Sequence, residues 1–187
     1  MKYKEPVFNM NIILIGYRCS GKTAVGKILA QKLKRQFVDL DEAIEAQTGS
    51  DIKWLVSRKG WGYFRQVERQ MIQTLTQNEN LVLATGGGVV MDPLNVKDLK
   101  ANGLLVYLEA DARVLTQRMQ RDQISGHIRP ALTDDDDPIK EIEAVLKERA
   151  PFYLDAGDFI VNTSDRSPEE VVQAVIDHAK MEPFKQA

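Results

Sequence analysis

The segment GYRCSGKT, at positions 16–23, carries residue types that bind phosphate. It matches the pattern G-x-x-x-x-G-K-[ST], with Gly16, Gly21, Lys22 and Thr23 at the fixed positions. In such a loop, glycines let backbone N–H groups surround a phosphate, the lysine reaches the β- and γ-phosphates, and the hydroxyl is a ligand for Mg²⁺. An apolar run precedes the segment and a helical pattern follows it, so we expect a nucleotide-phosphate site here.

Two aspartates, Asp39 and Asp41, stand two positions apart in FVDLD. If this segment is extended, both carboxylates project from the same face. One could hold Mg²⁺ through water while the other accepts a substrate hydroxyl. The alternative is that Asp41 caps the following helix and Asp39 is a solvated strand end.

Three consecutive glycines, Gly86, Gly87 and Gly88, follow another apolar run. Such a run lets backbone amides approach a ligand closely, although a flexible turn would have the same composition. Two arginines, Arg65 in YFRQVER and Arg149 in KERAPFY, lie far apart in the sequence. Nothing in their spacing brings them together, and each is open to interpretation as a surface arginine, Arg65 in a helical pair with Glu68.

Periodicity disappears over DQISGHIRPALTDDDDP, from Asp122 to Pro138, a connection longer than most in a compact domain. We interpret it as a lid from which Arg129 could swing onto a transferring phosphate. The acidic run 134–137 is expected to be solvated, with Asp137 capping the next helix, and we assign it no metal.

The lone cysteine and the two histidines are not assigned chemistry. Cys19 is at a variable position of the loop, and a redox role near a helix N-terminus is the alternative to an ordinary loop residue. His127 and His178 have no second metal ligand at helical or finger spacing, so we expect both at the surface.

Strand and helix patterns alternate along the chain, which predicts an α/β fold with a parallel sheet and ligands beyond the carboxyl ends of its strands. The expected strands are 11–16, 36–41, the apolar part of 80–88, 104–110 and 159–162. The expected helices are 22–33, 42–49, 51–60, 62–77, 112–121, 139–154 and one that begins at Pro168.

A length of 187 residues predicts one domain, and a net charge of −2 gives no basic field for nucleic acid. The longest apolar run near the start is IILI, too short for a signal-peptide core or a membrane span. A single cysteine suits a reducing compartment. We therefore expect a cytoplasmic protein with no nucleic-acid or membrane partner, and a monomer, because no feature demands a dimer.

The order GYRCSGKT, FVDLD, FRQVE, ATGGGVV, IRPAL and ERAPFY, over about residues 11–176, resembles the shikimate kinase family. The resemblance implies ATP-dependent phosphorylation of the shikimate 3-hydroxyl, a step towards chorismate and aromatic amino acids. It also implies a P-loop NTPase fold of the nucleoside-monophosphate-kinase type, as one domain over 1–187. The sheet would have five parallel strands in the order 2-3-1-4-5, with a mobile lid at about 122–137 and a shikimate-binding helical segment at about 41–70.

The same resemblance implies residue roles at the nucleotide. The phosphates of ATP would be held by Gly16, Cys19, Ser20, Gly21, Lys22, Thr23 and Ala24, and by Arg129 of the lid. Mg²⁺ would be held by Thr23 and, through water, by Asp39. The adenine would lie between Arg121 and Arg166, with Pro168 beside them. Tyr17 and Arg18 are bulkier than the residues of many relatives and leave the fixed loop positions unchanged.

At the acceptor, Asp41 would grip the shikimate hydroxyls and take the reacting proton. Arg65 and Arg149 would bind the carboxylate in a forked geometry. Gly86, Gly87 and Gly88 would contact shikimate through the backbone. The residues placed in catalysis are Lys22, Asp41 and Arg129.

Two other classes of function remain open. One is another small-molecule kinase, for gluconate or a nucleotide, although paired arginines and DLD favour a carboxylated polyol. The other is a nucleotide-dependent switch or binding module. A GTPase switch should carry an N-K-x-D segment that binds guanine, and the chain has none. A degenerate kinase that only binds nucleotide would be expected to lose Lys22, Asp39 or Asp41, and all three are present.

Overall fold

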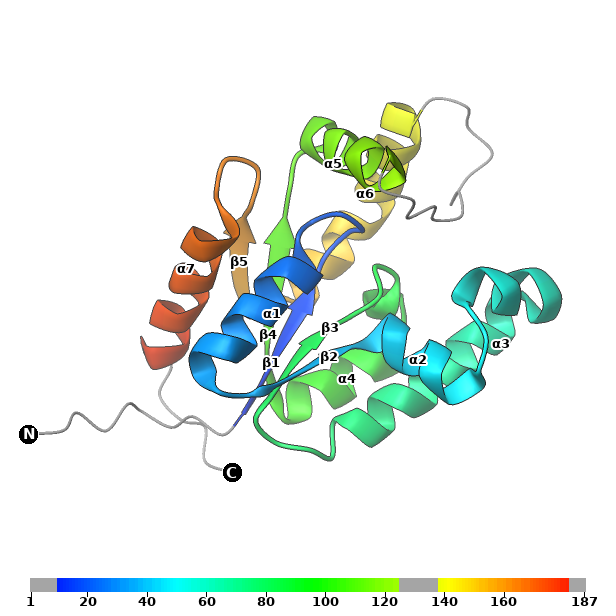
Figure 1. Cartoon of the computed structure of the whole chain (residues 1–187), viewed down its shortest axis with the longest axis horizontal. Helices are drawn as coiled ribbons and strands as arrows, with labels where there is room; N and C mark the ends of the chain where they lie inside the picture. The colour runs from blue at the N-terminus through cyan, green and yellow to red at the C-terminus, as the bar shows by residue number, and fades with distance from the viewer. Residues whose placement is uncertain (1–9, 125–137, 182–187) are drawn as a thin grey trace, which may run out of the picture.

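A computed structural model of the chain describes residues 10–124 and 138–181, which form a central sheet with helices on both faces (Figure 1). The sheet has five parallel strands in the order β2-β3-β1-β4-β5, which confirms the predicted topology. In chain order the strands are β1 (Asn11–Ile15), β2 (Gln36–Asp39), β3 (Leu81–Ala84), β4 (Gly103–Glu109) and β5 (Phe159–Asn162).

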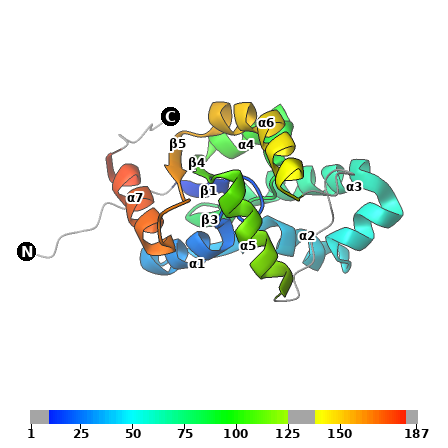
Figure 2. The ribbon, with the colours of Figure 1, turned by 90° about the horizontal axis from the view of Figure 1, so that it is seen from above.

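The helices divide between the two faces of the sheet. Helices α1 and α7 cover one face and α3, α4 and α6 the other (Figure 2). Helix α5 lies beyond the carboxyl ends of the strands, against α6 (Figure 1). Their bounds are α1 (Lys22–Leu33), α2 (Leu40–Thr48), α3 (Ile52–Leu75), α4 (Pro93–Ala101), α5 (Ala112–Ile124), α6 (Pro138–Ala156) and α7 (Pro168–Met181), with a 3₁₀ turn at Val89–Met91. None of the helices in these described ranges is long and apolar enough to cross a membrane.

Strand β1 is buried on both faces, which is why its sequence is a continuous apolar run after Asn11. Ile12 and Leu14 pack towards α1 and α7, whereas Ile13 and Ile15 pack towards the opposite layer. The strand is therefore fixed from both sides, and the loop that leaves its carboxyl end starts from a rigid support.

Strand β2 ends two residues earlier than the pattern FVDLD suggests. The Asp39 carboxylate accepts a hydrogen bond from the Asp41 backbone N–H at 3.1 Å, which caps the start of α2. Asp41 therefore lies in the first helical turn, so the expectation of an extended segment was wrong at this residue. The alternative that Asp41 is the cap was also wrong, because Asp39 has that role.

The two helices predicted at 51–60 and 62–77 correspond to one element, α3, which is interrupted at Gly60. Gly60 has φ 81° and ψ 165°, so α3 is two helical stretches that meet at this residue. Helix α4 was not predicted, although Asp92 caps it and Pro93 occupies its first position.

Helix α5 continues to Ile124, so the expectation that regular structure ends at Asp122 was wrong for residues 122–124. The lid itself stays a prediction. Arg129, His127 and the acidic run, with Asp137, lie outside the described residues.

Two leucines provide a direct test of the core. Leu29 of α1 is fully buried between the sheet and α7, whereas Leu94 of α4 is 55% exposed. We expect Leu29→Ala to lower the free energy of unfolding by about 2–5 kcal/mol, because it leaves a cavity. The matched control Leu94→Ala is expected to cost about 0.5 kcal/mol or less. Urea denaturation measures both, and equal losses would contradict the assigned packing.

Candidate active site

The phosphate loop joins β1 to α1 and has a backbone that only its residue types allow. Gly16 and Gly21 have φ of 142° and 101°, and Cys19 has φ 62°. A Cβ on Gly16 would lie 2.5 Å from the Leu108 carbonyl oxygen, so a side chain does not fit there. The loop curls over the N-terminus of α1, whose free N–H groups and dipole favour an anion.

Lys22 directs its charge into this loop. Its side chain is buried, and its Nζ donates to the carbonyl oxygens of Gly16 at 2.9 Å and Tyr17 at 2.7 Å. An ammonium group so placed is within the concavity where phosphate oxygens would bind.

Thr23 and Asp39, the two predicted metal ligands, lie side by side. The Thr23 hydroxyl donates to Asp39 Oδ2 at 2.9 Å, which joins the first turn of α1 to the end of β2. In the described ranges no three His, Cys, Asp or Glu residues form a metal-binding group. A hydroxyl and a carboxylate nevertheless suit Mg²⁺, which keeps several waters and takes further oxygens from substrate phosphates.

The glycine run, residues 86–88, lies after β3 and is approached by three polar side chains. A Cβ on Gly86 would be 3.1 Å from Asp41 Oδ1 and 3.2 Å from Glu68 Oε1. A Cβ on Gly88 would collide with the guanidinium of Arg65. A side chain at Gly86 or Gly88 would therefore have to displace these groups, because two carboxylates and an arginine stand directly against the backbone.

Arg149 reaches the same run from α6. Its Nη1 donates to the Gly87 carbonyl oxygen at 3.4 Å, and the Tyr153 hydroxyl donates to that oxygen too. Tyr153 is fully buried and stacks on Tyr107, with ring centroids 5.0 Å apart. The fold therefore brings Arg65 and Arg149 to one place, which their spacing in the sequence could not predict.

Glu68 orients Arg65. Its Oε2 lies 2.5 Å from Arg65 Nη1, and its side chain is fully buried. Burial raises the pKa of Glu68 above its ordinary value of 4.5, and the neighbouring Arg65 opposes that shift. The helical pair weighed from the sequence does exist, and its arginine lies against Gly88 while remaining 37% exposed.

Two buried polar atoms in this cluster, Glu68 Oε1 and Arg149 Nε, have no hydrogen-bond partner within the described residues. Buried polar atoms in native proteins are nearly always paired, with protein, water or ligand. The cluster therefore has the polar character of a site for a small hydrophilic molecule.

The phosphate loop and the glycine run are in contact. A Cβ on Gly87 would lie 3.5 Å from both the Arg18 nitrogen and the Gly16 carbonyl oxygen. Thr85 donates from its backbone N–H and from its hydroxyl to the Leu14 carbonyl oxygen, each at 3.1 Å. A phosphate in the loop would consequently face a molecule on the glycine run.

Sequence reasoning missed the residues that brace the phosphate loop. Arg118 Nη2 donates to the Thr163 carbonyl oxygen at 2.6 Å, and its Nη1 donates to the Cys19 carbonyl oxygen at 3.4 Å. The Thr163 hydroxyl donates to the Ser20 carbonyl oxygen at 3.2 Å. No motif marks this pair, whereas Tyr153 carried a signal, since it follows Arg149 by four residues on the same helix face.

The remaining predicted nucleotide residues are at the edges of the described structure. Arg121 is in the last turn of α5, and Arg166 and Pro168 are exposed at the start of α7. The bond from Arg118 to Thr163 joins α5 to the segment between β5 and α7, which also contains Arg166. Contact of these residues with adenine stays a prediction, as does any role of Arg129.

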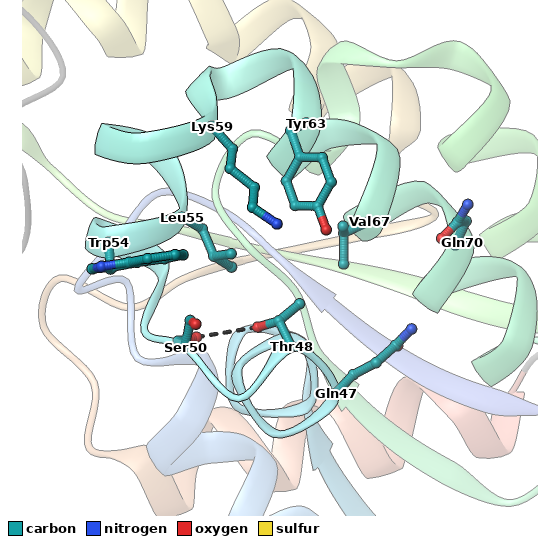
Figure 3. Close-up of a pocket in the computed structure, with 9 residues that line it drawn as sticks. All are labelled: Gln47, Thr48, Ser50, Trp54, Leu55, Lys59, Tyr63, Val67 and Gln70. Atoms are coloured by element: carbon teal, nitrogen blue, oxygen red, sulfur yellow. Dashed lines mark hydrogen bonds between the residues drawn. The ribbon is translucent and has the colours of Figure 1, made fainter.

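A pocket of about 450 Å³ lies elsewhere, between α2 and α3 (Figure 3). Tyr63, Val67 and Gln70 line it from one face of α3, and helical spacing puts Arg65 and Glu68 on the other face. No predicted site residue lines this pocket.

A phosphate loop that faces a carboxylate and two arginines, at the carboxyl edge of a parallel sheet, defines a P-loop kinase for a small acceptor. The family model for shikimate kinase matches residues 18–180, and the chain belongs to that family. As a member it is a phosphotransferase with an alcohol acceptor, which confirms the resemblance noted in the sequence.

Individual shikimate kinases are similar to the chain over most of its length. The chain is 39% identical over 181 residues to a shikimate kinase of Syntrophus aciditrophicus, covering 93% of both chains. It is 41% identical over 166 residues to one of Thermodesulfovibrio yellowstonii, covering 89% of this chain and 92% of the relative. A solved shikimate kinase of Acinetobacter baumannii in complex with shikimate superimposes with a TM-score of 0.84 at 34% identity, covering 93% and 96%.

The raised pKa of Glu68 predicts how stability depends on pH. The stabilisation that protonated Glu68 gives the folded state is complete below pH 4.5, the ordinary pKa that the group has in the unfolded chain. This stabilisation is lost as the pH rises through the higher pKa of the folded state. The wild type should therefore lose stability relative to Glu68→Gln as pH rises from 4.5 towards neutrality, measured by urea denaturation.

Glu170 is the matched control. Hydrogen bonds from the backbone and side chain of Ser167 lower the pKa of Glu170. The wild type should accordingly gain stability relative to Glu170→Gln over a rising pH series, the opposite trend. Parallel pH profiles for the wild type and Glu68→Gln would contradict the burial of this carboxyl.

Proposed function

We propose that the chain transfers the γ-phosphate of ATP to the 3-hydroxyl of shikimate, giving shikimate 3-phosphate and ADP on the route to chorismate and aromatic amino acids. The observation that carries this proposal is the meeting of Arg65 and Arg149 at the glycine run, beside the phosphate loop. Shikimate is a carboxylated polyol, and paired guanidinium groups suit a carboxylate. The Acinetobacter relative, solved with shikimate, supports the same acceptor.

At the nucleotide, the loop amides and Lys22 hold the phosphates. Lys22 Nζ exchanges its bonds to the Gly16 and Tyr17 carbonyl oxygens for phosphate oxygens, and its charge tracks the transferring group. The Thr23 hydroxyl and, through water, the Asp39 carboxylate fit Mg²⁺, which when bound neutralises charge on the phosphates.

At the acceptor, Arg65 and Arg149 bind the shikimate carboxylate and so fix which hydroxyl faces the phosphate loop. Glu68 holds Arg65 in this orientation through their ion pair. Asp41, against Gly86, binds the shikimate hydroxyls and accepts the proton of the reacting one. The backbone of Gly86, Gly87 and Gly88 contacts shikimate.

Such an arrangement supplies what phosphoryl transfer needs, which is an aligned acceptor and neutralised charge more than covalent chemistry. Exclusion of water is also needed, because an open site wastes ATP on hydrolysis. The lid predicted at about 122–137, with Arg129, would provide that, and both remain predictions from the sequence.

We also propose that the enzyme works as a cytoplasmic monomer. The support for a monomer is that no feature of the sequence demands a dimer. The lone Cys19 suits a reducing compartment.

The competing kinases are separated by their acceptors. ADP release should be measured with ATP and either shikimate, gluconate or a nucleoside monophosphate. We expect a kcat/KM for shikimate about 100-fold or more above the others, because a site built to pair polar groups rejects acceptors that leave them unpaired.

The variant Lys22→Ala controls for contaminating kinases and should abolish the shikimate signal. ADP release with shikimate no faster than with gluconate or nucleotides would overturn the proposed acceptor. Tight ATP binding without transfer to any of these alcohols would favour a binding module instead.

A further inference from the structure

Arg18 occupies a variable position of the phosphate motif, so the motif gives its side chain no role. The side chain extends to α6, where Nη2 lies 2.6 Å from Glu141 Oε1. Both side chains are only 10% exposed. At that burial, a charge that loses its partner is expensive to keep in the fold, so the pair resists separation.

Neighbouring contacts strengthen this junction. The Tyr17 hydroxyl accepts a hydrogen bond from Arg18 Nε at 3.3 Å. The Tyr17 ring is buried in an apolar cluster with Leu115 of α5 and with Ile142 and Val145 of α6. Two consecutive loop residues therefore attach the phosphate loop to the amino-terminal part of α6.

The same helix carries the acceptor arginine. Arg149 follows Glu141 by eight residues, about 12 Å along a helix with a rise of about 1.5 Å per residue. Arg149 and Tyr153 contact the Gly87 carbonyl oxygen, and Gly87 in turn lies against the Arg18 backbone. The contacts form a closed ring from Arg18 through Glu141 and α6 to Gly87 and back.

Within this ring the hydrogen bond from Arg149 to Gly87 is weaker than the ion pair between Arg18 and Glu141. Arg149 Nη1 lies 3.4 Å from the Gly87 oxygen, close to the limit of a hydrogen bond, whereas the Arg18–Glu141 pair is at 2.6 Å. Tyr153 holds the carboxyl-terminal part of α6 on the same oxygen, so loss of the ion pair would release the amino-terminal part of α6, and the weak Arg149 contact would be the first to change. We infer that Arg18 and Glu141 are positioning residues, whose ion pair docks α6 on the phosphate loop and so sets Arg149 for the acceptor carboxylate.

This inference rests on the proposed function, in which Arg149 binds shikimate, and it predicts a specific non-additivity. Shikimate binding should be titrated calorimetrically into the full-length wild type, Glu141→Gln, Arg149→Ala and the double variant. We expect Glu141→Gln to raise the Kd about tenfold when Arg149 is present, and less than about twofold when Arg149 is already Ala.

Two further variants keep the test decisive. Asp98→Asn breaks an ion pair with Arg69 of similar length, 2.7 Å, that joins α3 to α4, and it should leave the shikimate Kd within about twofold of the wild type. If a thermal melt shows that Glu141→Gln is not folded, Arg18→Lys replaces it in the titrations. Arg18→Lys keeps a charge near Glu141 and should give a smaller increase in Kd that also vanishes in the Arg149→Ala background.

An unchanged Kd in Glu141→Gln would overturn the inference. An equal fold-increase with and without Arg149 would also overturn it, since that is the behaviour of general destabilisation. If the wild type phosphorylates shikimate but the Glu141→Gln and Arg149→Ala effects on the Kd are additive, the inference is overturned and the proposed function stands. A wild type that neither binds nor phosphorylates shikimate would overturn both.

Discussion

Parallel pairing of β1 with β3 is the constraint on which the site depends. Register fixes Leu14 opposite Ala84, so both strands end at the same edge of the sheet. The phosphate loop and the glycine run leave that edge as neighbours, and the Thr85 bonds to Leu14 tie them together. Strand β2 pairs with the other side of β3 and ends with Asp39 opposite Ala84, which brings the start of α2 to the same edge. A slip in this register would separate the phosphate donor from its acceptor.

Each of three cations near this edge of the sheet lies against oxygen atoms that carry negative or partial negative charge. Lys22 is enclosed by carbonyl oxygens, Arg65 by the buried Glu68, and Arg18 by Glu141. Lys22 and Arg18 are thereby held in buried positions, while Arg65, whose side chain is 37% exposed, is oriented by its buried partner. Fixed orientations of this kind favour recognition of an anion without a large reorganisation. The net charge of −2 shows that anion binding here is a local property and not one of the whole surface.

Motifs predicted the parts of the site that follow directly from a strand end. The phosphate loop, the glycine run and a parallel sheet were accessible from local strand, glycine and helix patterns, whereas the strand order came only from the resemblance to the shikimate kinase family. Asp41 was misplaced, since whether FVDLD stays extended depends on a capping bond that Asp39 makes to the backbone. The meeting of Arg65 with Arg149, and the bracing by Arg118 and Thr163, depend on how helices dock, which spacing does not encode.

The central claim is that the acceptor carboxylate lies between two arginines at the glycine run. A crystal structure of the protein with shikimate and ADP tests it most directly. The account predicts carboxylate oxygens within about 2.7–3.2 Å of both the Arg65 and Arg149 guanidinium groups, with a ring hydroxyl at Asp41. Shikimate bound away from both arginines, for instance in the pocket beside Trp54 and Lys59, would contradict it.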